Sequence, residues 1–190
     1  MDTLTERDFV KAAFILECEI AAIKAVCEVE APNGGFAKSG NPTILFEGHI
    51  FHRYSKGRFT EKHPTLSYPK WTRAHYAKTQ DGEWVRLQAA MRLDETAALM
   101  SASWGKFQIM GFNFALCGYK SVEEFVEAMQ ESEAKQLDAF VQYILATGLQ
   151  DELQARDWPK FARYYNGPEY KKNRYDTKLA KAFTKYRELA

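Results

Sequence analysis

The sequence predicts a mostly α-helical domain with little sheet, and three observations support this. Apolar residues recur at steps of three and four in several long stretches, as they do on one face of a helix. One short apolar run, residues 43–52, lacks that period and leaves room for a strand. The chain has 190 residues, of which 46% are hydrophobic, which is enough for one core and one domain.

The first helix is predicted over residues 5–30, and the sequence Ala-Pro-Asn-Gly-Gly at residues 31–35 stops it. Its apolar positions share one face, namely Phe9, Ala13, Leu16, Ile20, Ile23 and Cys27. The next step of three falls on Glu30, whereas Glu28 lies roughly 200° away on the polar face. We therefore expect Glu30 to be buried and its pKa to be raised toward neutrality, as a general acid requires.

The middle of the chain alternates loops with shorter elements. Residues 31–43 are rich in glycine and proline and are predicted to form a loop or a small hairpin. The apolar run at residues 43–52 is a strand or a helix, because periodicity does not separate the two. The next segments are predicted as a loop, a helix broken near Asp81-Gly82 and a short helix, over residues 53–70, 71–93 and 94–100.

The second half of the chain is predicted to be a helical bundle. Ser121 begins an amphipathic helix that ends at Gly148, with a break between Met129 and Leu137. Two further helices are predicted over residues 158–165 and 176–189.

Composition limits the classes of protein to consider. No stretch reaches the roughly 18 apolar residues of a membrane span, and the acidic, polar N-terminus does not resemble a secretory signal. The three cysteines, Cys18, Cys27 and Cys117, are expected to be buried thiols of a protein made in a reducing compartment. The net charge of +1 argues against nucleic acid as a partner.

Charge is nevertheless distributed unevenly. Residues 121–154 carry eight acidic residues and one lysine, a net charge of −7. Residues 155–190 carry ten basic and four acidic residues, a net charge of +6. Two interpretations stay open: the basic segment lies against an anionic polymer such as a bacterial cell wall, or it is a solvated face that pairs with the acidic helix.

Glu30 and Glu47 form the first candidate site. Each lies among apolar neighbours, in segments that must pack together. Glycoside hydrolysis uses one carboxyl group to protonate the leaving oxygen and usually a second, across the sugar, as base or nucleophile. The alternative is a structural role, in which Glu47 is buried and paired with Arg53, Arg73 or Arg92.

A metal site is the second candidate. His49 and His52 are three apart, a spacing that on a helix can bind one zinc ion with His63 or His75 as third ligand. That would suggest a zinc-dependent amidase or peptidase of the cell-wall kind. The sequence has no His-Glu-x-x-His motif and no second ligand-rich cluster, which favours histidines that are hydrogen-bonded inside the fold.

The third candidate combines residues 101–113 with residues 164–168. Small residues, a tight Trp-Gly turn and Gln108 beside apolar side chains suit a cleft wall that binds an amide or a hydroxyl group. The same composition suits ordinary packing, so composition does not decide between the two.

Taken in order along the chain, these stretches resemble the N-acetylmuramidase catalytic domain of phage endolysins. The resemblance spans roughly residues 7–186 and rests on Val29-Glu30 with the glycine-rich turn after it, ILFEGHIFHR at 44–53, SASWGKFQIMGFN at 101–113 and Tyr165-Asn166-Gly167-Pro168. More distantly, the pattern is similar to goose-type lysozymes and soluble lytic transglycosylases, which place a catalytic Glu at the end of a long helix. Lys106 and Phe107 differ from the Leu-Met usual in those distant relatives, so contacts of these two side chains are not carried over.

The resemblance implies a mostly α, lysozyme-like α+β fold. It would have a long N-terminal helix ending at the catalytic Glu30, a small irregular or β lobe and a C-terminal helical bundle. Residues 1–190 would form a single muramidase domain with no separate cell-wall-binding module. The implied partner is bacterial peptidoglycan, with no nucleic acid and no membrane. We expect a monomer that stays in the host bacterial cytoplasm until its release to the cell wall.

The resemblance also implies roles for single residues. Glu30 would be the general acid, Glu47 the second carboxylate that activates water, and the sugar sites would be lined by Ser103, Gln108, Tyr165 and Asn166. The reaction would be hydrolysis of the β-1,4 bond between N-acetylmuramic acid and N-acetylglucosamine, with no metal or cofactor. The goose-type resemblance favours inversion at the anomeric carbon.

Three alternatives stay open. In a lytic transglycosylase the 6-hydroxyl of the substrate attacks, so no second carboxylate is needed, and the presence of Glu47 favours hydrolysis. The other two are a zinc-dependent amidase and a wall-binding module without catalysis.

Overall fold

The structure is a computed structural model that describes residues 3–30 and 34–189. Helices dominate the described chain, with bounds α1 Glu6–Leu16, α2 Ile20–Glu30, α3 Gly48–Tyr54, α4 Gln80–Met91, α5 Glu95–Met100, α6 Val122–Glu131, α7 Glu133–Thr147, α8 Gln150–Ala155, α9 Trp158–Tyr165, α10 Tyr170–Asn173 and α11 Tyr175–Glu188. Three short strands, β1 Ile44–Phe46, β2 Ala102–Trp104 and β3 Ile109–Met110, form one antiparallel sheet in the order β1-β2-β3. The predicted mostly helical fold with a small sheet is confirmed.

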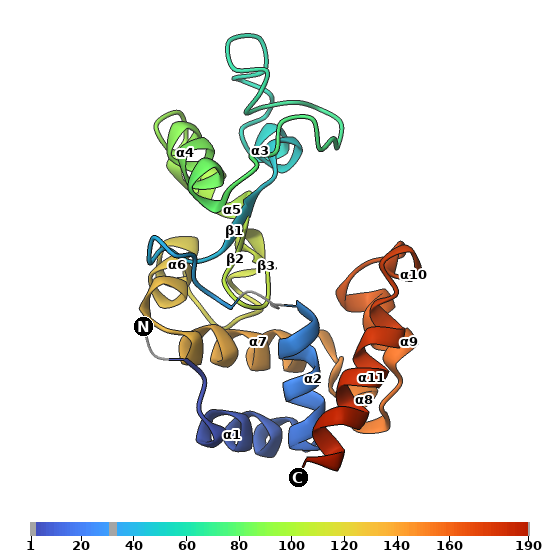
Figure 1. Ribbon diagram of the computed structural model, residues 1–190. Helices are drawn as coiled ribbons and strands as arrows, with labels where there is room; N and C mark the ends of the chain where they lie inside the picture. Colours follow the sequence, from blue (N-terminus) through green and yellow to red (C-terminus); the bar gives the residue numbers. More distant parts are fainter. Residues whose placement is uncertain (1–2, 31–33, 190) are drawn as a thin grey trace.

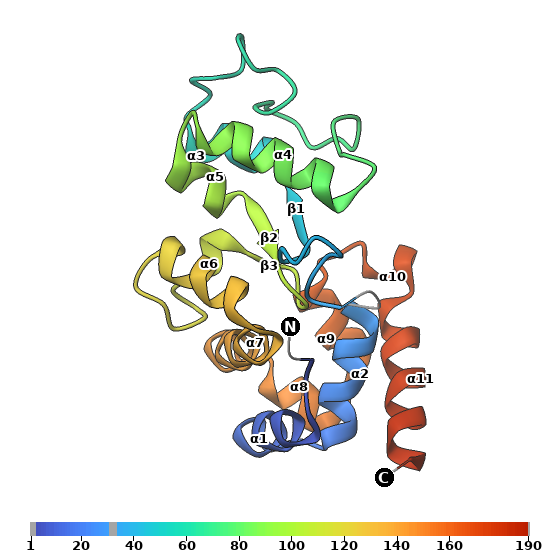
Figure 2. The ribbon, with the colours of Figure 1, turned by 60° about the vertical axis from the view of Figure 1, so that its left-hand side comes forward.

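The helices form two lobes on either side of the sheet (Figure 1). The smaller lobe contains α3, α4 and α5, and the larger one contains α1, α2 and α6 to α11. Figure 2 shows the same division from a second direction, with the sheet connecting the lobes. Since α2 ends at Glu30 and Glu47 follows β1, the two candidate carboxylates belong to different lobes.

The single long helix predicted over residues 5–30 is wrong, because the structure has two helices there. Glu17 adopts a left-handed conformation with φ of 51°, and its N–H donates back to Phe14 O. This is a common way for a helix to end. Lys11 of α1 pairs with Asp138 of α7 at 2.8 Å, and α2 leaves at a steep angle (Figure 1). The apolar spacing does not reveal a break this short, since it continues on both sides.

The apolar run at residues 43–52 contains both a strand and a helix: β1 passes into α3, and Glu47 lies at their junction. The predicted helix over residues 71–93 is wrong in its first part, because α4 begins only at Gln80. Thr79 Oγ1 accepts the Gly82 N–H and so fixes that start. The short helix predicted at residues 94–100 is confirmed as α5.

The bundle of the second half follows the prediction closely. Ser132 separates α6 from α7 at the predicted break, and its side chain accepts the Lys135 N–H as the N-cap of α7. α9 and α11 match the last two predicted helices, whereas the short helices α8 and α10 have no predicted counterpart. No helix among the described residues has the length and apolar character needed to cross a membrane.

The acidic and basic segments are paired with each other only in part. In the described chain, the ion pair Lys160–Glu152 joins them. Four other charges of these segments pair outside them: Asp138 with Lys11, Glu133 with Lys106, Arg156 with Glu19, and Lys185 with Glu28. The basic segment therefore pairs with the acidic segment at one ion pair only among the described residues. Most lysines of the basic segment are exposed.

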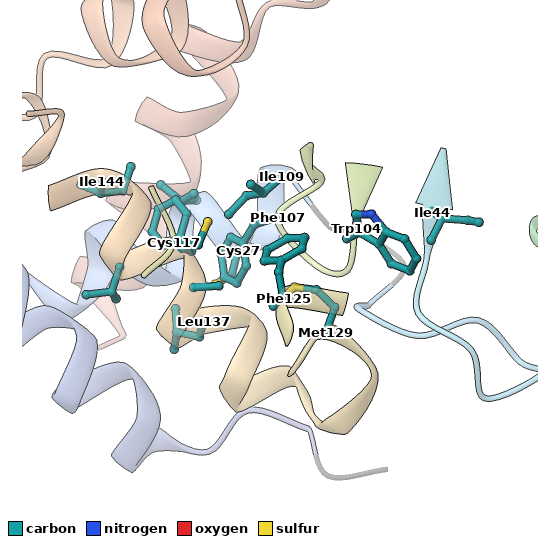
Figure 3. Close-up of a cluster of buried hydrophobic side chains, with 14 of the residues drawn as sticks. Cys27, Ile44, Trp104, Phe107, Ile109, Cys117, Phe125, Met129, Leu137 and Ile144 are labelled. Atoms are coloured by element: carbon teal, nitrogen blue, oxygen red, sulfur yellow. The ribbon is translucent and has the colours of Figure 1, made fainter. Parts of the chain in front are cut away.

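Buried aromatic and sulfur-containing side chains attach the sheet to the larger lobe. Phe107, in the turn between β2 and β3, stacks on Phe140 of α7 with ring centroids 4.5 Å apart. Figure 3 shows Phe107 close to Cys27 of α2 and to Phe125 of α6. Cys27 and Cys117 are buried and Cys18 is half-buried, all as free thiols. This packing fixes the β2–β3 turn relative to the end of α2, where Glu30 lies.

Candidate active site

Glu30 is the last residue of α2 and follows a run of buried residues on that helix. Burial of the carboxyl group raises the pKa of Glu30 from 4.5 to about 7, and this is the largest influence on it. The Asn166 side-chain amide donates to Glu30 Oε1 at 2.8 Å, and this bond and the charge of Lys178 act in the opposite direction. The predicted rise in pKa is therefore present, and a carboxyl group of this kind is protonated in a useful fraction of molecules near neutral pH.

Glu28, two residues earlier, has the opposite surroundings. Its side chain is 38% exposed and accepts a hydrogen bond from Lys185 Nζ at 2.6 Å. That hydrogen bond lowers the pKa of Glu28. The two glutamates thus differ as the helical wheel predicts, and Glu30 is the one that suits proton donation.

Two neighbouring residues, Tyr165 and Asn166, connect Glu30 to the sheet. The Tyr165 hydroxyl donates to Phe107 O at 2.8 Å, and burial raises its pKa well above the ordinary value. Asn166 uses its amide nitrogen on Glu30, while its Oδ1 is buried and has no hydrogen-bond partner in the described chain. A buried acceptor without a partner is uncommon and marks this position for attention.

Glu47 is held at the end of β1 by its backbone and by a tyrosine. Its N–H donates to Ser101 O at 2.9 Å, and the Tyr76 hydroxyl lies 2.8 and 2.7 Å from its two carboxylate oxygens. His49 Nδ1 lies 3.3 Å from Glu47 Oε2, and the Glu47 side chain is 15% exposed. The predicted alternative of an arginine partner is wrong for the described structure, since Tyr76 and His49 occupy that place.

The pKa of Tyr76 is raised by burial and by its hydrogen bond to Glu47. The hydroxyl therefore keeps its proton and remains a donor to the carboxylate.

The residue after Glu47 has to be glycine. A Cβ on Gly48 would lie 2.3 Å from Tyr68 Cε1 and 2.7 Å from Leu66 O. The long loop between α3 and α4 can therefore pack directly on the backbone beside Glu47. This loop carries Tyr76, so the close approach explains how a residue 29 positions away reaches the carboxylate.

Ser103 and Gln108 form a hydrogen bond with each other. Both were predicted to contact sugar. Ser103 Oγ donates to Gln108 Oε1 at 2.8 Å, and Gln108 Nε2 donates to Gly105 O at 2.9 Å and to Thr43 O at 3.3 Å. Gln108 has φ of 49°, an unfavourable value for a residue other than glycine. These bonds hold the β2–β3 turn in that conformation, so both side chains have a clear structural task.

The sheet sets the relation between the two glutamates. Leu45 pairs with Ser103, and the β2–β3 turn lies beside Thr43 through the Gly105 N–H···O bond of 2.8 Å. The turn and Glu30 therefore lie toward one end of β1, and Glu47 lies at the other. The sheet therefore lies between the backbone positions of the two glutamates.

The histidines considered as alternative zinc ligands have other contacts. His52 Nδ1 lies 2.8 Å from Thr60 Oγ1, and the His75 ring packs on Tyr68 with centroids 4.9 Å apart. Among the described residues, no group of three or more His, Cys, Asp or Glu side chains is placed to hold a metal ion. The zinc cluster considered as an alternative is therefore not assembled among the described residues.

Sequence reasoning missed Tyr76, whose contact with Glu47 is the shortest in this part of the site. No local signal could have found it, because it lies in a stretch whose apolar spacing indicated a helix. His49 was noticed only as a metal ligand, although its position two residues after Glu47 is compatible with the contact observed.

Comparisons with known proteins agree with the sequence resemblance. Residues 19–187 match the family model described as N-acetylmuramidase. The chain is similar to an endolysin of Enterobacteria phage PRD1, with 32% identity over 105 residues that cover 48% of this chain and 69% of that protein. It is also similar to the crystal structure of the Burkholderia AP3 phage endolysin, with a TM-score of 0.89 and 42% identity, over 97% of this chain and 72% of that one.

Proposed function

Because this chain belongs to the N-acetylmuramidase family and is a peptidoglycan-cleaving enzyme, we propose that it hydrolyses the β-1,4 bond between N-acetylmuramic acid and N-acetylglucosamine. Glu30 acts as the general acid in this proposal. The observation that carries it is the partly buried Glu30, whose desolvated carboxyl group has its pKa raised to about 7. A protonated Glu30 gives its proton to the glycosidic oxygen as the bond to the anomeric carbon breaks.

Asn166 supports this step from the side. Once the proton has left, Glu30 is a buried anion, and the Asn166 amide at 2.8 Å is its hydrogen-bond donor. A hydrogen bond to a charged group contributes about 1.5–3 kcal/mol. Asn166 is therefore a positioning residue for the general acid, which is more specific than the sugar-lining role expected from the resemblance.

Glu47 acts as the second carboxylate. The Tyr76 hydroxyl donates to it, which orients the carboxylate and leaves lone pairs for a water molecule. A water held by Glu47 loses a proton to the carboxylate as its oxygen attacks the anomeric carbon. The opposite lobe already supplies the acid, so the two functions are separated in space.

The placement of the two glutamates in different lobes favours inversion. Inverting enzymes hold the two carboxyl groups roughly 6.5–9.5 Å apart, and retaining enzymes hold them only about 5–5.5 Å apart. Glu30 ends α2 of the larger lobe, and Glu47 follows β1, which leads into the smaller lobe. This arrangement leaves room for a water molecule between Glu47 and the sugar.

The test of Glu30 compares two variants of one helix. Glu30→Gln is expected to lower the rate of wall lysis by about 10²–10⁴-fold while the protein stays folded. Glu28→Gln is the matched control, because Glu28 lies two residues earlier and pairs with Lys185 at the surface. If Glu28→Gln loses activity and Glu30→Gln stays active, the general acid is Glu28 and the proposed role of Glu30 is wrong.

Product analysis tests the reaction itself. Mass spectrometry of digested wall should show reducing N-acetylmuramic acid ends if water attacks. Ends with a 1,6-anhydro ring would instead identify a lytic transglycosylase. Cleavage with no new sugar ends would indicate an amidase, and binding to wall material without soluble products would indicate a wall-binding module.

A further inference from the structure

We propose that Trp71 is a stacking platform for a pyranose ring of the glycan strand, which adds a binding position to the two carboxylates. This inference rests on the proposed function only in taking its ligand to be the glycan of peptidoglycan. No role was expected for Trp71 from the sequence.

Exposure distinguishes Trp71 from the other tryptophans. Trp84, Trp104 and Trp158 are 9%, 1% and 7% exposed and belong to the core. Trp71 is 58% exposed, in the loop that leaves the smaller lobe between α3 and α4 (Figure 1). Exposing a large apolar ring to water is unfavourable in free energy. The simplest explanation is that a bound partner covers the ring when the protein acts.

The ring is also fixed in place, unlike a side chain that is exposed by chance. The indole N–H of Trp71 lies beside the Tyr76 hydroxyl and faces its oxygen. That hydroxyl in turn donates to both Glu47 oxygens, at 2.8 and 2.7 Å. Trp71, Tyr76 and Glu47 are thus neighbours, and the indole meets Tyr76 by its edge and not by a ring face.

One face of the ring is already occupied. The Arg73 guanidinium lies 5.6 Å from the centroid of the Trp71 ring, within the range of a cation–π contact. The exposure of Trp71 therefore belongs mainly to the opposite face. A single open face on a rigid aromatic ring suits a flat apolar partner of similar width.

A pyranose ring of a β-1,4-linked glycan is such a partner. Its substituents are mostly equatorial, so its C–H bonds form an apolar face that packs on an aromatic ring, while the hydroxyl and acetamido groups stay at the rim. The Tyr76 hydroxyl contacts the Glu47 carboxylate and faces the indole N–H, so it lies between the two. This places the platform next to the proposed site of cleavage.

The experiment measures binding to an uncleaved glycan. Soluble, amidase-treated glycan strands are titrated into Glu30→Gln by calorimetry, and then into the same protein with Trp71→Ala or Trp71→Phe. Trp71→Ala should weaken binding roughly tenfold, equivalent to about 1.4 kcal/mol. Trp71→Phe keeps an aromatic face and should lose only a small part of the affinity. Phe14→Ala is the matched control and should bind as the parent does, because Phe14 is 83% exposed on α1 in the other lobe.

A role for Trp71 that acts only through Tyr76 predicts a different pattern. Phe lacks the N–H, so Trp71→Phe and Trp71→Ala would then be equally impaired, and in the active protein kcat would fall while KM stayed constant. Stacking predicts the reverse, a rise in KM for Trp71→Ala with kcat nearly unchanged. Unchanged glycan affinity in Trp71→Ala, or no glycan binding by the parent, overturns the proposal.

The two proposals fail separately. If digested wall lacks reducing N-acetylmuramic acid ends, the proposed hydrolysis is wrong even when Trp71→Ala weakens glycan binding. If the ends are present and Trp71→Ala binds as the parent does, the stacking platform is wrong and the hydrolysis stands.

Discussion

The two candidate carboxylates occupy opposite surroundings. Glu30 ends a helix of the larger lobe, where burial raises its pKa to about 7 and one amide donates to it. Glu47 ends a strand that leads into the smaller lobe, where a tyrosine hydroxyl donates to both of its oxygens. One environment favours the neutral carboxyl group of Glu30, and the other orients Glu47 through hydrogen bonds from a tyrosine.

This difference shows how identical side chains can receive different tasks. An acid that must give up a proton near neutral pH benefits from burial, and a base that must accept one from water benefits from staying ionised. Neither property depends on the residue type. Each follows from what the surrounding elements place beside the carboxyl group, so each can be changed by substituting a neighbour.

The largest predicted effect is the loss of hydrolysis when Glu47 is replaced. Glu47→Gln keeps the shape and the hydrogen bond from Tyr76 but cannot accept a proton, so hydrolysis should fall by about 10²–10⁴-fold. The rate of reducing-end formation from purified wall measures this. Glu61→Gln, an exposed carboxylate of the neighbouring loop, is the control. A Glu47→Gln protein that cleaves at the normal rate and yields anhydro ends would show that Glu47 has no part in the reaction.

The second prediction concerns stability and comes from Glu30. Below pH 4.5 the carboxyl group is protonated in both the folded and the unfolded chain and contributes no pH dependence. Between pH 4.5 and about 7 only the unfolded chain ionises, so the free energy of unfolding falls with rising pH. The penalty reaches about 3 kcal/mol above pH 7.

Glu30→Gln removes that penalty because an amide does not ionise. The variant should have the stability of the wild type at pH 4 and exceed it by about 3 kcal/mol at pH 8, as measured by urea unfolding at both values. Glu28→Gln should show no such gain, because the pKa of Glu28 is lowered and not raised. An equal difference at both pH values would mean that the Gln substitution acts through packing alone.

The sequence was sufficient for features with a local cause. The buried face of α2, the choice of Glu30 over Glu28 and the break before α7 all follow from spacing and capping within about one helical turn. The break at Glu17 could not be predicted, because Leu16 and Ile20 keep the same spacing on either side of it. What ends α1 is a left-handed residue, and what holds α1 in its new direction includes a contact with Asp138 far along the chain.

The site divides in the same way. Glu30 and Glu47 could be named from the sequence, but their partners come from distant segments. Asn166 reaches Glu30 across 136 positions, and Tyr76 reaches Glu47 from a loop that spacing had assigned to a helix. Ser103 and Gln108 were expected to contact sugar, and only the structure shows that they bond to each other. Tertiary packing decides which side chains hydrogen-bond to the two carboxyl groups, and the periodicity of the sequence gives no information about such distant contacts.

The smallest predicted effect tests the link between Glu30 and Asn166. Asn166→Ala removes the donor to Glu30, and this hydrogen bond lowers the pKa of Glu30. The pKa should therefore rise, and the pH at which activity declines on the alkaline side should move up by about one unit. The rate at pH 6 should fall about tenfold, because the ionised Glu30 loses its donor. Measured pH–rate profiles of both proteins give the two quantities.

The direction of the shift distinguishes this role from simple damage. An Asn166→Ala protein that loses activity equally at every pH, with the alkaline limb in its original place, would show that Asn166 acts on the substrate or on folding and not on the proton of Glu30. Asn173→Ala, an exposed asparagine at the end of α10, should leave both the limb and the rate unchanged. A shift toward higher pH together with a lower rate arises only if the same amide restrains the proton and stabilises the anion that remains.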